Sequence, residues 1–320
     1  ILTDEKTPAY GIYVHGGLKI DNVKITSWNP QTNTFAMSNG SRENSGPSTA
    51  ICGSDCNNAL KSKLTHIGIP RPFISVEENT TGTTNITNSE IAYLGYEGGY
   101  GIKSSGLHYT GGDGSVIRNN DIHHLYFGFY SASGVGNIII ENNKIHDSGH
   151  YGIDPHTGTH DMIIRNNTVY NNNGTAIICS VNCHNITYDN NTVYHNNGAG
   201  IVLSRNTTQS VAKNNFIHDQ IKPILLDQSN NNVVYNNRIL NTNTSGISLI
   251  DESSENKIYN NFIQNATNGI SLKNDKGENL IHGNSIYSNK IINPERKAID
   301  ANSNITSTNT INRSSNQIIK

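Results

Sequence analysis

Short runs of aliphatic residues, broken by Gly and Asn, dominate the chain from about residue 88 onward. No stretch of ten residues carries apolar side chains at the helical period of 3.6, so the pattern predicts short strands joined by tight turns. A six-residue motif such as Ile117–Ile122 recurs, and its central Asn stands at positions 120, 143, 167, 191, 215, 237, 261 and 284. The steps between these positions are 23, 24, 24, 24, 22, 24 and 23 residues, which indicates a structural repeat.

A coil of about 24 residues with three short strands is the unit of a right-handed parallel β-helix, an all-β solenoid. Successive coils of such a solenoid stack about 4.8 Å apart. The recurring Asn predicts an internal ladder, in which each Asn adopts the left-handed conformation of a tight turn and hydrogen-bonds to the Asn above and below. We expect a single domain over residues 1–320, with irregular N-terminal coils and loops over 1–87, regular coils over 88–291 and a C-terminal cap over 292–320.

The segment from about Trp28 to Lys63 is too long for an ordinary connection, so it either crosses a substrate groove or forms a cap. It contains the first of two close cysteine pairs, Cys52/Cys56 and Cys179/Cys183. This spacing predicts two short-loop disulfides in an oxidising compartment, with four buried thiols as the alternative. A zinc site is not favoured, because the two pairs lie far apart on a linear scaffold.

Composition limits the classes of partner. Charged residues make up 15% of the chain, the net charge is −2 and no run of Lys or Arg occurs, which disfavours a nucleic-acid or membrane-surface partner. No window reaches eighteen consecutive apolar residues, so we expect no membrane span. The first residues lack the regions of a signal peptide, whereas the cysteine pairs and abundant Asn-x-Ser/Thr sequons fit a secreted, periplasmic or cell-surface protein. We expect a monomer.

The heptapeptide 150–156 gathers two imidazoles, a phenol and a carboxylate in an otherwise weakly charged chain. The coil repeat aligns this segment with its neighbours, because residues at equal offsets from the recurring Asn should stack. On this alignment Tyr130 lies beside Asp154 in one row of outward side chains. A second row contains Ala132, His156, Ser180, Ser204 and Asp227.

Two cationic residues flank these rows. The segment 101–103 stands in the same register as 128–130, across an insertion, so Lys103 would extend the row of Tyr130 and Asp154. Arg205 lies one residue beyond the His156 row and two coils along, roughly 10 Å away. The resulting groove suits an acidic polysaccharide, and we expect its substrate-binding residues to be Tyr130, Lys103, Asp227, Ser180 and Ser204.

A uronic-acid polymer offers one reaction that such a groove can perform. Its C5 proton is weakly acidic, so removal of that proton needs a base near C5 and a cation or strong donors at the adjacent carboxylate. His156 or Tyr151 could be the base, with the other as the acid on the opposite face. Arg205 or Lys103 could neutralise the carboxylate, and Asp154 could orient the imidazole or hold a hydroxyl. Packing, turn formation and solvation are the structural alternatives for the phenol, the aspartate and the arginine.

The segment Tyr151–His156 resembles the Tyr-Gly-x-Asp-Pro-His signature of the mannuronan (alginate) C5-epimerases, which are right-handed parallel β-helices. The likeness covers roughly residues 88–290. The segments 89–96, 126–130 and 200–206 look like the corresponding coils of the periplasmic branch of that family.

The resemblance implies conversion of β-D-mannuronate to α-L-guluronate within the polymer, without chain cleavage. It implies that His156 is the catalytic base, Tyr151 an acid or second proton carrier, Asp154 the carboxylate of the motif and Arg205 a carboxylate-neutralising residue. The family's calcium-binding nonapeptide arrays are missing from this chain, so we expect no cofactor, and calcium dependence is undetermined.

The chain also departs from the family pattern. Thr157 stands where Asp often follows the motif, and an arginine expected near Val181 is absent. Two alternatives stay open: a polyuronate lyase, which shares the first step but expels the C4 oxygen, and a non-catalytic β-helix that binds polysaccharide at a cell surface.

Overall fold

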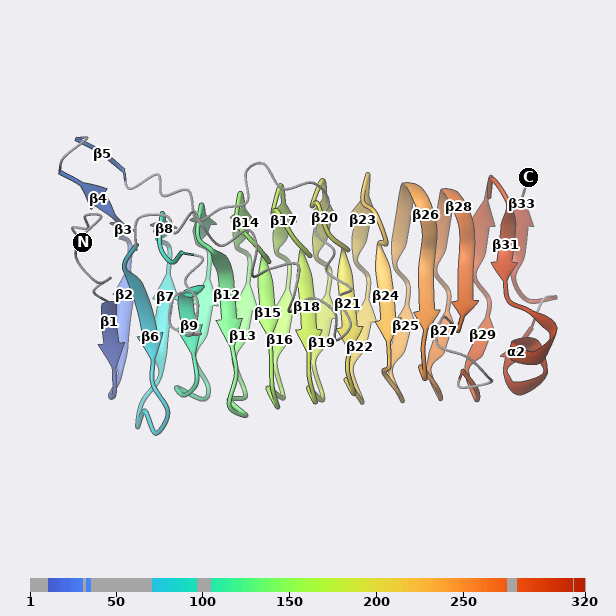
Figure 1. Ribbon diagram of the computed structural model, residues 1–320, viewed down its shortest axis with the longest axis horizontal. Helices are drawn as coiled ribbons and strands as arrows, with labels where there is room; N and C mark the ends of the chain where they lie inside the picture. Colours follow the sequence, from blue (N-terminus) through green and yellow to red (C-terminus); the bar gives the residue numbers. More distant parts are fainter. Residues whose placement is uncertain are drawn as a thin grey trace, which may run out of the picture.

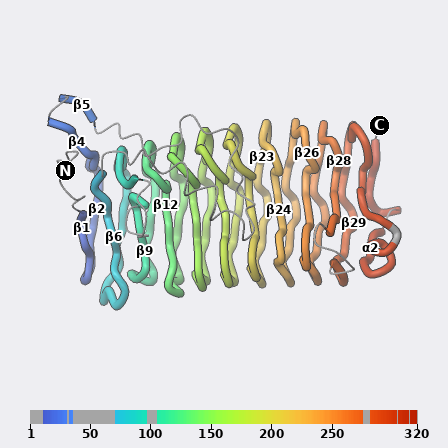
Figure 2. Tube along the Cα trace, viewed as in Figure 1, coloured from blue at the N-terminus to red at the C-terminus, as the bar shows by residue number. Residues whose placement is uncertain are grey.

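The computed structural model describes residues 11–30, 33–35, 71–96, 105–274, 281–312 and 314–319. The chain winds into an elongated solenoid with β1 (Gly11–Val14) at one end and β33 (Gln317–Ile319) at the other (Figures 1 and 2). The described strands pair in parallel, except for a hairpin of β4 (Trp28–Asn29) and β5 (Thr34–Phe35). The predicted all-β parallel solenoid is therefore confirmed.

Each coil supplies strands to three parallel stacks, which we name the site, flanking and third stacks. The site stack contains β1, β6 (Phe73–Val76), β9 (Gly106–Tyr109), β12 (Phe127–Ser131), β15 (Ile153–Pro155), β18 (Ile177–Ser180), β21 (Ile201–Ser204), β24 (Ile224–Asp227) and β31 (Lys297–Asp300). The flanking stack contains β3 (Lys24–Thr26), β8 (Glu90–Ala92), β11 (Asp121–His123), β14 (Lys144–His146), β17 (Thr168–Tyr170), β20 (Thr192–Tyr194), β23 (Phe216–His218), β30 (Lys290–Ile292) and β33.

Two long strands, β26 (Arg238–Ile250) and β28 (Phe262–Lys273), run through both of these stacks. The third stack contains β2 (Leu18–Asp21), β7 (Thr84–Thr87), β10 (Val116–Arg118), β13 (Ile139–Glu141), β16 (Ile163–Arg165), β19 (Thr187–Asp189), β22 (Val211–Lys213), β25 (Val233–Tyr235), β27 (Lys257–Tyr259), β29 (Ser285–Tyr287) and β32 (Thr310–Ile311). A short helix, α2 (Ser303–Thr308), precedes β32.

The core is a column of aliphatic side chains inside the coils. In the third stack the middle residue of a three-residue strand points inward, so that Ile117, Ile140 and Ile164 are fully buried in register with one another. Alternation along so short a strand leaves the two outer residues of β10 and β16 partly or fully exposed, whereas Glu141 of β13 is buried. Strands of three or four residues therefore suffice to fill the interior, because each coil adds to the same continuous core.

Each repeat uses two Asn residues, one for the left-handed turn and one for the buried ladder, where the sequence predicted a single Asn for both. The first takes the left-handed conformation, as at Asn166 (φ 56°) and Asn190 (φ 53°). The second is buried, and its amide Nδ2 donates to the Oδ1 of the next Asn at 2.8–3.1 Å along the series 120, 143, 167, 191, 215, 237 and 261. The ladder prediction is confirmed, but a single Asn does not serve both the turn and the ladder.

Asn284 does not continue this ladder, contrary to the sequence alignment. The amide of Asn261 donates instead to Asn289 at 3.0 Å, a step of 28 residues along the chain. Asn284 belongs to a second ladder, where it accepts from Asn256 at 3.0 Å and donates to Asn309 at 2.8 Å. Extra residues between β28 and β29 lengthen this coil, so a fixed step of about 24 residues selects the wrong Asn.

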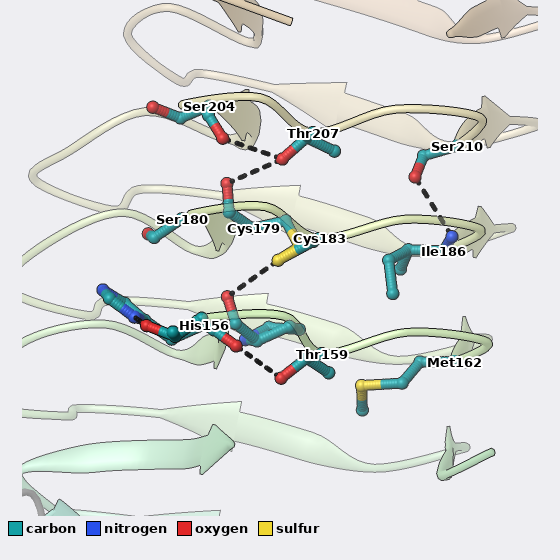
Figure 3. Close-up of a disulfide and its surroundings, with 12 residues drawn as sticks. His156, Thr159, Met162, Cys179, Ser180, Cys183, Ile186, Ser204, Thr207 and Ser210 are labelled. Carbon is teal, nitrogen blue, oxygen red and sulfur yellow. Dashed lines mark hydrogen bonds between the residues drawn. A yellow bond between two sulfur atoms is a disulfide. The ribbon is translucent and has the colours of Figure 1, made fainter. Parts of the chain in front are cut away.

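Cys179 of β18 forms a disulfide with Cys183, which follows that strand, one coil beyond β15 (Figure 3). Both cysteines are fully buried, and the Cys183 sulfur lies 3.6 Å from the carbonyl oxygen of Pro155. The expected pair Cys52–Cys56 lies outside the described residues. Within the described part of the chain, no helix is long and apolar enough to cross a membrane.

Candidate active site

The heptapeptide places three polar side chains along and beside one strand of the site stack. In β15 the side chain of Ile153 points into the core, whereas that of Asp154 faces outward. Tyr151 lies just before this strand, and His156 follows it directly. Tyr130 of β12 pairs in register with Asp154, as the sequence alignment predicted. In the second predicted row, Ser180, Ser204 and Asp227 pair in register across β18, β21 and β24.

Asp154 is a buried carboxyl, with 2% of its surface exposed. The Ser180 hydroxyl donates to its Oδ1 at 3.3 Å. Burial raises the pKa of Asp154 well above its usual value, while the Ser180 hydrogen bond and the Arg205 charge act in the opposite direction. Asp154 therefore keeps its proton to a higher pH than an exposed aspartate, and a protonated carboxyl can donate a hydrogen bond to an anionic group.

His156 is held as a neutral imidazole. Its Nδ1 lies 2.6 Å from the hydroxyl of Thr157, and its ring stacks on Tyr130 with the centroids 5.6 Å apart. Burial and the charge of Arg205 lower the pKa of His156 to about 4. The imidazole is consequently unprotonated at neutral pH and can accept a proton. Thr157, which departs from the family motif, is the residue that orients this ring.

Tyr151 stands at the other end of the strand in an aromatic and apolar setting. Its ring stacks on His150 with the centroids 3.8 Å apart and meets Phe127 edge-on at 5.6 Å. It also packs against a small apolar cluster on the outer surface of the sheet that includes Ile178 and Val202. Tyr151 and His156 thus flank Asp154 from opposite ends of β15.

Arg205 follows β21 in a left-handed conformation with φ of 47°, and its side chain is exposed. Its charge lowers the pKa values of both Asp154 and His156. Next to it, the Ser204 hydroxyl donates to Oδ2 of Asp227 at 3.4 Å. Arg205 thus acts electrostatically on a buried carboxyl and a neutral imidazole that lie two coils before it.

His108 occupies the place that the sequence alignment gave to Lys103. It pairs in register with Tyr130, and their ring centroids lie 5.6 Å apart. Lys103 itself lies outside the described residues. The sequence allows two registers across the insertion. Both segment 101–103 and segment 106–108 show the small-apolar-polar pattern of Gly128-Phe129-Tyr130, so this pattern alone does not select the one that pairs with Tyr130.

Family models match two overlapping parts of the chain. The model described as "Right handed beta helix region" matches residues 73–215, and the one described as "Periplasmic copper-binding protein (NosD)" matches residues 178–320. The described side chains include no group of three or more His, Cys, Asp or Glu residues placed to hold a metal ion. They do not fit a copper site, so we derive no chemistry from copper.

Solved structures with the same fold include an alginate epimerase and an alpha-1,3-glucanase. The periplasmic alginate epimerase AlgG aligns with a TM-score of 0.70 and 19% identity, over 99% of this chain and 74% of that chain. The Agl-KA catalytic domain aligns with a TM-score of 0.58 and 15% identity, over 98% and 62% of the two chains. The catalytic domain of a GH87 alpha-1,3-glucanase aligns with a TM-score of 0.55 and 14% identity, over 97% and 63%.

No curated protein sequence matches the chain at a significant level. At the identities of the solved structures, the likeness establishes the fold. It confirms the right-handed β-helix of the periplasmic alginate epimerases that the Tyr-Gly-x-Asp-Pro-His motif predicted.

Proposed function

We propose that this protein is an extracytoplasmic mannuronan C5-epimerase that converts β-D-mannuronate to α-L-guluronate units within alginate. The observation that supports this most directly is the arrangement around β15. A tyrosine and a histidine with a pKa of about 4 flank the short strand that carries a buried aspartic acid, and the charge of an arginine acts on the histidine and the aspartic acid. These groups match the requirements of proton removal next to a carboxylate, and the epimerase fold of AlgG agrees with that chemistry.

The proposed reaction breaks and forms a single C–H bond. His156 takes the C5 proton, and the electron pair moves into the neighbouring carboxylate of the sugar. Arg205 and the protonated Asp154 stabilise the charge that develops on those oxygens. Tyr151 then returns a proton to C5 from the opposite face, and the glycosidic bonds stay intact.

Hydrolysis by a pair of aspartates from the two outward rows has less support. Asp154 and Asp227 stand in β15 and β24, three coils apart, which corresponds to about 14 Å along the solenoid. Glycoside hydrolases hold their two carboxyl groups about 5–9.5 Å apart. A lyase remains the nearest alternative, since elimination begins with the same proton abstraction.

One experiment distinguishes an epimerase, a lyase and a binding protein. The protein is incubated with polymannuronate in D2O, with and without calcium, and the products are monitored by proton NMR. An epimerase gives guluronate signals with deuterium at C5 and no unsaturated chain ends. Unsaturated ends would instead assign the same base to a lyase. Tight binding without either product would identify a polysaccharide-binding protein, and the catalytic roles of His156 and Tyr151 would be abandoned.

Gly174→Ala should lower the turnover number about 10- to 100-fold by displacing Tyr151. A Cβ at position 174 would lie 2.7 Å from Cδ1 of Tyr151 and 2.9 Å from Nδ1 of His150, so both rings must shift. Gly16→Ala is the matched control, because nothing lies within 4 Å of a Cβ at that position. Unchanged turnover by Gly174→Ala would show that the position of the Tyr151 ring does not limit the reaction.

A further inference from the structure

Aromatic and cationic side chains alternate along the outer face of the flanking stack in its C-terminal half. Phe216 of β23 pairs in register with Arg238 of β26. Phe262 of β28 comes next, and it pairs in turn with Lys290 of β30. Figure 1 shows β23, β26 and β28 side by side. We call Phe216, Arg238, Phe262 and Lys290 the cation–aromatic row, and each of them is at least partly exposed.

The two rings hold the arginine between them. Cζ of Arg238 lies 5.1 Å from the ring centroid of Phe216 and 5.8 Å from that of Phe262. Nζ of Lys290 lies 5.8 Å from the same Phe262 ring. These distances are within the range of cation–π attraction. Because a ring on either side restricts the guanidinium, its N–H donors keep a fixed direction, and the side chain of Arg238 is exposed to a ligand.

The positive charge of this row has no carboxylate partner within the described part of the chain. Neither Arg238 nor Lys290 forms an ion pair with a described carboxylate. Asp219, in the turn after β23, bonds to other groups: its Oδ2 lies 2.7 Å from Nδ1 of His218, and its Oδ1 accepts from the amide of Asn241 at 3.3 Å. The row therefore presents two cations that an anionic ligand can reach.

The spacing of the cations fits a polymer with one carboxylate on each sugar unit. Arg238 and Lys290 stand two coils apart, about 10 Å along the axis, with Phe262 between them. A sugar unit of an extended polymer is similar in length to one coil spacing, and alternate units face the same side. A uronate chain along the axis thus presents two carboxylates to the cations and the C–H face of the intervening unit to Phe262. The guanidinium fork of Arg238 suits a bidentate contact with a carboxylate.

We propose that the cation–aromatic row is a second binding surface for polyuronate chains, separate from the groove around Asp154. The inference rests on the proposed function for its class of ligand, and on the row itself for its place. A turn over residues 219–223 separates β23 of this face from β24 of the site stack. A polymer held on the row raises the local concentration of sugar units at the groove without entering the reaction.

The test is calorimetric titration of wild type and of Arg238→Gln/Lys290→Gln with octamannuronate. Wild type should show two binding events, of which the double variant loses one. Lys144→Gln/Lys257→Gln is the matched control, because it removes the same charge from two exposed lysines outside the row, and it should keep both events. Arg238→Lys should weaken the event about tenfold, since an ammonium keeps the charge but not the planar fork.

Identical isotherms for wild type and Arg238→Gln/Lys290→Gln would overturn the second surface, as would an equal loss of binding by the control. Thermal melting detects a purely structural row, for which the variant melts lower and still binds octamannuronate like wild type. A DNA duplex and phosphatidylglycerol vesicles test other polyanions. Tighter binding of either one, lost in the same variant, would overturn the polyuronate assignment.

Turnover of polymannuronate by wild type in D2O separates this inference from the proposed function. If wild type gives no product but Arg238→Gln/Lys290→Gln loses a binding event that the control keeps, the epimerase proposal falls and the second surface stands. If wild type epimerises the polymer and the isotherms are identical, the function stands and the second surface falls.

Discussion

His156→Gln is expected to lower kcat on polymannuronate by about 10³-fold or more, with little change in KM. The neutral imidazole is the group proposed to take the C5 proton, and loss of a positioned general base costs about 10²–10⁴-fold in rate. Glutamine keeps a polar side chain of similar size beside Thr157 and Tyr130 but cannot accept the proton. The measurement is the rate of deuterium incorporation at C5 in D2O.

His160→Gln is the matched control for this substitution. His160 lies in the same coil, stacks on His184 at 5.1 Å and bonds to Asp161 through Nδ1 at 2.7 Å, away from the outward row of β15. Activity should stay near wild type. Deuterium incorporation by His156→Gln at the rate of His160→Gln would remove His156 from the mechanism.

The pH dependence of wild-type kcat/KM should follow from the protonation of His156. The base works only when neutral, so kcat/KM should rise as pH increases through about 4, the pKa of His156, and level off above it. At high pH, activity should fall again when Asp154 loses the proton that its burial retains. An acid limb near the ordinary histidine pKa of about 6.5 would contradict the assignment of His156 as a desolvated base.

Asn191→Ala should destabilise the protein by about 3–5 kcal/mol, the largest loss of stability that we expect from one substitution. The Oδ1 of Asn191 accepts from the backbone N and the Nδ2 of Asn167 at 3.0 and 3.1 Å. Its own Nδ2 donates to the carbonyl of Ile164 at 2.9 Å and to Asn215 at 3.0 Å. Alanine leaves these buried groups without partners in an interior from which water is excluded.

The neighbouring position supplies the control for the ladder. Asn190 is exposed, takes φ of 53° and donates to Asn166 at 2.8 Å at the surface, so Asn190→Gly should change stability by less than about 0.5 kcal/mol. Chemical denaturation followed by circular dichroism measures both variants. Equal midpoints for Asn191→Ala and Asn190→Gly would show that the buried amide ladder does not stabilise the coils.

The coil, its period and the register of most outward side chains follow from the sequence alone. Parallel strands of equal coils stack in register, so residues at equal offsets become neighbours without knowledge of any other contact. This is why Tyr130 was correctly paired with Asp154, and Ser180 with Ser204 and Asp227. The alignment failed where insertions break the period, at Asn284 and at the entry to β9.

Tertiary structure decided the properties that depend on several coils at once. The sequence supplied His156 and Asp154 as neighbours in a motif, but their opposite pKa shifts arise from burial and from Arg205, about 50 residues away along the chain. Which Asn of each pair forms the turn and which forms the ladder likewise depends on which side chain faces the interior of the coil. A repeat in the sequence therefore determines which residues are neighbours, because stacking is local and periodic. The chemistry of those residues depends on desolvation and charge, which only the assembled coils provide.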